Sequence, residues 1–123
     1  MTREIDAGPA SDIPPGCMRL VPEGRYGIGV YNVGGRFHAL LNYCVHEGAP
    51  LCAGRITGTT DAPDGRHAIW VREGEILRCP WHGWEFDIAT GAAVAIAGQR
   101  VRTYPVSVRD GRLRIELPAR GGA

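Results

Sequence analysis

Short apolar runs separated by glycine turns mark the first half of the chain. Tyr26–Val33 and Arg36–Leu41 are two such runs, and Gly34-Gly35 stands between them. A glycine pair between two strand-like segments is typical of a two-residue hairpin turn, because both turn residues can adopt a positive φ. The pattern predicts a β-hairpin from residue 26 to residue 41.

A second hairpin is expected near the carboxyl end. Val106 and Val108 alternate with polar residues before the turn-forming pair Asp110-Gly111. Apolar positions then alternate again from Leu113 to Leu117. A period of two places alternate side chains on one face of a strand, so this segment is predicted to be the returning strand.

A third pair of runs lies in the middle of the chain. Ala68–Arg72 and Glu75–Arg78 flank Glu73-Gly74, and we interpret them as another hairpin that leads directly into Cys79. No stretch keeps a helical 3.6-residue period. The chain is therefore expected to be all-β, with roughly eight to ten short strands in small antiparallel sheets.

The length of 123 residues suits one small domain, which we place at residues 17–117. Both ends are rich in proline, glycine and alanine. Residues 1–16 are therefore expected to form an irregular N-terminal segment, and residues 118–123 a C-terminal tail.

Charge and hydropathy exclude several classes of partner. The formal net charge is only +1, so no electrostatic footprint for nucleic acid is present. Residues 1–24 contain no apolar run that would serve as a signal peptide or a membrane anchor. We expect a cytoplasmic protein that binds neither nucleic acid nor a membrane.

Two short motifs carry the candidate chemistry. Cys44-Val45-His46 and Cys79-Pro80-Trp81-His82 each offer one thiolate and one imidazole. Two sulfur and two nitrogen ligands suit either a tetrahedral zinc ion or an iron–sulfur cluster. The ligand types alone leave both open.

The residues around the two motifs separate these options. The first motif continues as Glu47-Gly48-Ala49-Pro50-Leu51, and the second continues through Gly83-Trp84-Glu85-Phe86-Asp87 to Thr90-Gly91. This arrangement closely resembles the Rieske [2Fe–2S] family, whose loops read C-x-H-x-G and C-P-x-H-G-x-x-F-D-x-x-T-G. Zinc knuckles favour repeated C-x-x-C pairs and do not account for the residues after His82.

The resemblance implies one [2Fe–2S] cluster per chain, with two loops at one tip of a small β-fold. Cys44 and Cys79 would hold the inner iron, and His46 and His82 the outer iron. In such centres two histidines replace two cysteines on one iron, which raises the reduction potential.

The function implied by the resemblance is that of a soluble ferredoxin. It would pass single electrons from a reductase to a terminal oxygenase or a related oxidoreductase, without a substrate site of its own. The stretch after Asp87 is too short for the mononuclear iron domain of a terminal oxygenase. The second hypothesis is a small Rieske-fold subunit of a larger oxidoreductase complex, and the third is a structural zinc-binding module.

One departure from the family concerns spacing. The interval from His46 to Cys79 is nearly twice as long as in small Rieske ferredoxins. The excess falls at about residues 59–73, where turn-forming residues cluster. An inserted loop with a longer hairpin would absorb it without moving the ligands, since surface insertions cost little.

Two further cysteines and two further histidines lie outside ligand contexts. We expect Cys17 and Cys52 to be small buried or half-buried residues rather than ligands. His38 and His67 are expected to be ordinary strand or surface residues.

The loop residues also bear on the reduction potential. High-potential Rieske proteins carry a disulfide beside the cluster, at positions that are Ala49 and Trp81 here. They also carry serine and tyrosine hydroxyls that donate to cluster sulfur, where this chain has Trp84 and Phe86. Losing donors to sulfur lowers the potential, so the resemblance implies a low-potential, soluble type.

Overall fold

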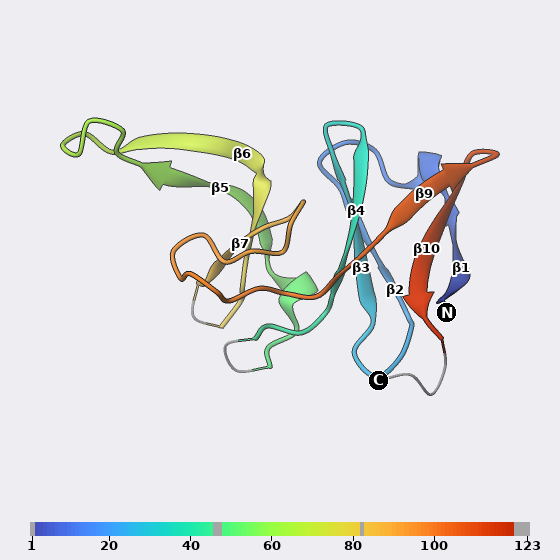
Figure 1. Ribbon diagram of the computed structural model, residues 1–123. Helices are drawn as coiled ribbons and strands as arrows, with labels where there is room; N and C mark the ends of the chain where they lie inside the picture. Colours follow the sequence, from blue (N-terminus) through green and yellow to red (C-terminus); the bar gives the residue numbers. More distant parts are fainter. Residues whose placement is uncertain (1, 46–47, 82, 120–123) are drawn as a thin grey trace.

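The computed structural model describes residues 2–45, 48–81 and 83–119. The described residues form ten β-strands and two short 3₁₀ turns (Figure 1). In chain order these are β1 (Thr2–Pro9), η1 (Ala10–Asp12), β2 (Met18–Val21), β3 (Ile28–Val33), β4 (Arg36–Leu41), η2 (Leu51–Ala53), β5 (Arg55–Asp61), β6 (Ile69–Arg78), β7 (Glu85–Asp87), β8 (Thr103–Tyr104), β9 (Val106–Arg109) and β10 (Arg112–Pro118). The all-β prediction is confirmed. Within these ranges no helix is long and apolar enough to cross a membrane.

The strands form three antiparallel sheets, with the four-stranded sheet β2-β3-β4-β8 between the other two. One hydrophobic core joins it to the sheet β1-β10-β9 through side chains such as Val30 and Ile115. A second core joins it to the sheet β5-β6-β7 through side chains such as Tyr31 and Phe86. Because Val30 and Tyr31 are neighbours in β3, they point to opposite faces, and β3 is buried on both.

The two glycine-turn hairpins occur where the pattern predicted them. β3 and β4 pair with Val33 opposite Arg36, and the intervening Gly34 and Gly35 have φ values of 60° and 94°. β9 and β10 pair across a turn in which Asp110 also takes a positive φ. Both turns match the two-residue type that fits the twist of the strands.

The third predicted hairpin is wrong. Residues 69–78 form one long strand, β6, which pairs with β5 rather than folding back at Glu73-Gly74. Arg72 and Gly74 have positive φ values of 58° and 84°, and the β5–β6 register shifts there. A bulge needs the same backbone conformations as a turn, so the glycine marks a bulge in β6.

The N-terminal segment is not irregular, which corrects the prediction for residues 1–16. β1 pairs antiparallel with β10, with Ile5 opposite Ile115, and so supplies an edge strand of its sheet. Ala7 is buried, and Ile13 is only 1% exposed. Of the predicted C-terminal tail, Pro118 ends β10, and residues 120–123 lie outside the described residues.

The predicted insertion at residues 59–73 maps to the far part of the β5–β6 hairpin. This part, with the connecting residues 62–68, extends away from the other two sheets (Figure 1). Ile69 and Trp70 are about half exposed on it. These residues therefore form a hairpin, and that they are an insertion relative to the family stays a prediction.

Candidate metal centre

The two predicted ligand loops have the same backbone hydrogen-bond pattern. In the first, the Cys44 N–H donates to the Ala49 carbonyl at 2.9 Å, and the Gly48 N–H donates back to the Cys44 carbonyl at 2.7 Å. In the second, the Cys79 N–H donates to the Trp84 carbonyl at 2.7 Å, and the Gly83 N–H donates to the Cys79 carbonyl at 3.2 Å. Each loop is thus a tight turn with a cysteine at its start.

Each turn depends on a glycine four residues after its cysteine. Gly48 and Gly83 have φ values of 75° and 72°, a region that residues with a Cβ rarely adopt. The Tyr43 ring also packs against Gly48, and a Cβ there would lie 3.1 Å from the ring. The glycines in the two motifs are therefore required by the geometry of the loops.

The end of the first loop touches the start of the second. η2 ends the first loop, and the following strand, β5, pairs Arg55 with Arg78. A Cβ at Gly54 would clash with the Arg78 carbonyl oxygen, so the two backbones approach closely here. This contact brings the segment carrying Cys44 beside the segment carrying Cys79.

Both cysteines are buried in the same core. Cys44 is 0% exposed and Cys79 is 2% exposed, and they share one hydrophobic cluster with Leu51, Leu77 and Phe86. Neither forms a disulfide. A buried cysteine is often only a small hydrophobe. Here two buried cysteines each begin one of two matching turns, and this arrangement can supply a metal site with one thiolate from each loop.

The two predicted imidazole ligands, His46 and His82, lie outside the described residues. Within the described part of the chain, no group of three or more His, Cys, Asp or Glu side chains is placed to hold a metal ion. Of the four predicted ligands, the structure describes only Cys44 and Cys79, so the full ligand set stays a prediction.

Exposed apolar side chains surround the loops. Trp81 is 51% exposed and Val45 is 36% exposed, whereas Leu51 is fully buried. Leu51 can therefore keep water from the cysteines on the core side. Half of the Trp81 surface faces solvent.

A network of charged side chains supports the second loop, and the sequence analysis missed it. Glu85 accepts hydrogen bonds from Thr59 at 2.6 Å and from Arg78 at 2.7 Å. Asp87 pairs with Arg72 at 2.5 Å. Partial burial opposes ionisation of both carboxylates, but these hydrogen bonds outweigh it and lower the pKa of each. The strand that leaves the loop is thereby tied to β5 and β6.

The remaining cysteines and histidines differ in their surroundings. Cys17 is exposed, so the prediction that it is buried or half-buried is wrong, whereas Cys52 is half-buried as expected. Burial raises the pKa of the Cys52 thiol. His38 lies in β4, and His67 is exposed and 2.6 Å from Asp64. Both histidines are strand or surface residues, as predicted.

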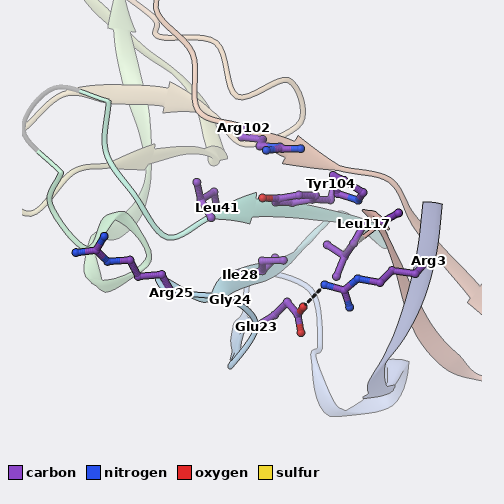
Figure 2. Close-up of a pocket in the computed structure, with 11 residues that line it drawn as sticks. Arg3, Glu23, Gly24, Arg25, Ile28, Leu41, Arg102, Tyr104 and Leu117 are labelled. Atoms are coloured by element: carbon purple, nitrogen blue, oxygen red, sulfur yellow. Dashed lines mark hydrogen bonds and ion pairs between the residues drawn. The ribbon is translucent and has the colours of Figure 1, made fainter. Parts of the chain in front are cut away.

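A cleft of about 350 Å³ lies on another part of the molecule (Figure 2). Tyr104 with Arg102 forms one wall and the Arg3–Glu23 ion pair another, and Ile28 lies between them. Neither Cys44 nor Cys79 lines it. The cleft is separate from the candidate metal centre.

Comparison with known proteins decides the family. The model of the Rieske [2Fe–2S] domain matches residues 4–105. The chain belongs to the Rieske [2Fe–2S] family. Its cofactor is accordingly a Rieske-type [2Fe–2S] cluster, and the paired buried cysteines fit that group, since two thiolates and two imidazoles ligate it.

Curated relatives align over nearly the whole chain. The ferredoxin component of the naphthalene 1,2-dioxygenase system of Pseudomonas aeruginosa is 31% identical over 115 residues, which cover 92% of this chain and 94% of that protein. The 3-phenylpropionate/cinnamic acid dioxygenase ferredoxin subunit of Escherichia coli strain K12 is 30% identical and covers 93% of each chain.

Solved structures agree on the fold. The Sphingomonas yanoikuyae B1 ferredoxin superposes with a TM-score of 0.69 at 31% identity, over 94% of this chain and 100% of that one. A chain from the complex of reduced oxygenase and oxidized ferredoxin in carbazole 1,9a-dioxygenase gives the same TM-score at 27% identity, over 91% of each chain.

Proposed function

We propose that this chain is a ferredoxin that carries single electrons from a reductase to a terminal oxygenase or a related oxidoreductase. The observation that carries the proposal is the pair of matching turns that bury Cys44 and Cys79 in one core. The relatives support it, because they are named as ferredoxin components of dioxygenase systems. The chain would act as an electron-transfer component and not as an enzyme with its own substrate.

We assign the cluster ligands to Cys44, His46, Cys79 and His82. The bound cluster supplies the one-electron redox chemistry. Two thiolates with two neutral imidazoles carry half the negative charge of four thiolates, so this ligand set makes the site easier to reduce. The tight turns hold the cysteines in the core, where water has little access to the thiolates.

The rim of the loops is the proposed docking surface for both redox partners. Val45, Pro80 and Trp81 are exposed there, and Arg55 lines a groove with Pro80. Exposed aromatic side chains and arginines are both enriched in protein interfaces. Partner groups that approach this rim would come near the ligand loops, which favours rapid electron transfer.

We test the ligand assignment with single substitutions. Cys44→Ala, His46→Ala, Cys79→Ala and His82→Ala should each lose the cluster, because each iron has only two protein ligands. Cys17→Ser serves as the matched control and should keep it. Iron and acid-labile sulfide are measured on the purified proteins. Full iron and sulfide in all four alanine variants would refute the assignment, and a colourless zinc protein would support the structural zinc module instead.

We also propose that the protein resides in the cytoplasm. None of its four cysteines forms a disulfide, which suits a reducing compartment. Cell fractionation with an antibody against the chain tests this location, and recovery in a membrane or secreted fraction would exclude it.

A further inference from the structure

Residue 42 closes the base of the first ligand loop. The chain leaves β4 at Leu41 and returns at η2, so positions 42 and 52 stand at the two ends of the loop. The Asn42 Oδ1 accepts a hydrogen bond from the Cys52 N–H at 2.8 Å. One side chain thus joins the two ends of the segment that carries Cys44.

The other half of the same side chain reaches a third segment. Asn42 Nδ2 donates to the Tyr26 carbonyl at 3.1 Å, and the Asn42 N–H donates to the Gly27 carbonyl at 2.9 Å. The next residue adds an aromatic contact, since the Tyr43 and Tyr26 rings lie 4.7 Å apart. The loop base is therefore fixed to the turn between β2 and β3.

The far end of the loop has a second anchor in the core. The Cys52 thiol lies beside the buried hydroxyl of Tyr31 and 4.0 Å from the Leu40 carbonyl. Gly29 makes room for it, because a Cβ at Gly29 would lie 2.5 Å from the Cys52 sulfur. Since the thiol holds residue 52 in place, its N–H presents a fixed donor to Asn42.

We propose that Asn42 is a positioning residue for the metal centre. It closes the loop from Asn42 to Cys52 and so holds Cys44 in the buried position that places it in one core with Cys79. Without this closure the loop could open at its base and admit water to the cysteine. The inference rests on the proposed function, because it concerns how firmly the chain holds its cluster.

The chain offers a matched control in Asn32. Its Nδ2 donates to the Ile13 carbonyl at 2.8 Å, and its Oδ1 accepts from the Gly35 N–H at 2.8 Å. Asn32 is 6% exposed, whereas Asn42 is half-buried. Asn32→Ala removes the same number of side-chain hydrogen bonds from a more buried site that does not touch the ligand loops.

The experiment compares the holoproteins of wild type, Asn42→Ala, Asn42→Asp and Asn32→Ala. Three quantities are measured: the rate at which visible absorption is lost in excess chelator, the reduction potential, and the thermal unfolding midpoint. We expect Asn42→Ala to lose the cluster on the order of tenfold faster than Asn32→Ala. Its reduction potential should also differ from that of the wild type. Its unfolding midpoint should fall no further than that of Asn32→Ala. Asn42→Asp keeps the acceptor for the Cys52 N–H but cannot donate to the Tyr26 carbonyl, so it should recover part of the lifetime.

Equal rates of cluster loss and equal potentials in Asn42→Ala and Asn32→Ala would overturn the inference. If Asn42→Asp loses the cluster as fast as Asn42→Ala, the hydrogen bond from the Cys52 N–H to residue 42 does not help to retain the cluster. If Asn42→Ala does not accumulate, Asn42→Ser and Asn32→Ser make the same comparison. A wild-type protein that binds no [2Fe–2S] cluster would refute the proposed function itself. That outcome differs from equal cluster loss in the two alanine variants, which would refute only the role of Asn42.

Discussion

Phe86 shows at the scale of one residue how the fold limits the reduction potential. Its ring is fully buried in the core that contains both cysteines, and it lies 6.4 Å from the Trp84 ring. Neither side chain has a hydroxyl to donate to sulfur. Hydroxyl groups that donate to sulfur stabilise the more negative reduced state, so a site without these two hydroxyls favours a low potential.

We predict a potential near the lower end of the Rieske range of about −150 to +300 mV. Phe86→Tyr should raise it, because the ring stays in place and the new hydroxyl can donate. Protein-film voltammetry measures both proteins. A wild-type value well above roughly +100 mV, on the scale of that range, would contradict the argument.

Asn42 illustrates which site residues a motif reveals and which it does not. The C-x-H and C-x-x-H motifs identified Cys44 and Cys79, because each motif lies within a few consecutive residues. The role of Asn42 depends on contacts with residues 26 and 52, and these arise only when the loop closes. A side chain whose partners are distant in sequence leaves no local signal.

At the scale of elements, the strand after the second loop is held by a salt bridge whose strength depends on pH. The Arg72 guanidinium joins β6 to Asp87 at the end of β7. Partial burial alone would raise the pKa of Asp87, but the hydrogen bond from Arg72 prevails and holds it below its usual 3.8. The pair therefore stabilises the fold above the unfolded pKa, and that stabilisation is lost as the pH falls through the lower, folded value.

Asp87→Asn should cost about 1 kcal/mol of unfolding free energy at pH 7, as expected for a partly exposed pair. The difference from wild type should shrink as the pH is lowered below about 4. Urea unfolding of both proteins from pH 7 to pH 3 measures it. A difference that is constant over this range would mean that the charge of Asp87 does not matter.

The far part of the β5–β6 hairpin should be dispensable for the metal centre. It extends away from the other sheets, and none of its described residues between 60 and 70 belongs to the core that contains both cysteines. We predict that replacing residues 61–69 with a short asparagine–glycine turn leaves the cluster content and the potential unchanged. A loss of cluster, with the β-sheet circular dichroism retained, would show that the hairpin supports the ligand loops.

The strands show why some elements were predicted and others not. The β3–β4 and β9–β10 hairpins join neighbours in sequence, so alternation and turn residues are sufficient to identify them. Gly74 was misread because a bulge and a turn favour the same residue. β1 was missed because it is defined by pairing with β10 at the other end of the chain, which no local pattern records.

For the whole molecule, β1 closes the sheet that covers one face of the central strands. Its pairing with β10 buries Ala7 and brings Ile5 against the core. Deleting residues 2–9 should lower the thermal unfolding midpoint by several degrees, since a domain of this size loses roughly 4 °C per kcal/mol. Scanning calorimetry of the holoprotein tests it, and an unchanged midpoint would show that β1 adds nothing to the stability of the domain.

Mixed ligation by one cysteine and one histidine from each loop is the central claim, and pulsed electron paramagnetic resonance tests it most directly. The protein is produced with ¹⁵N-labelled histidine and reduced with dithionite. We predict a signal whose average g-value lies below that of the free electron, with strong coupling to two labelled nitrogens. A signal from a reduced cluster without any strong histidine nitrogen coupling would contradict the account.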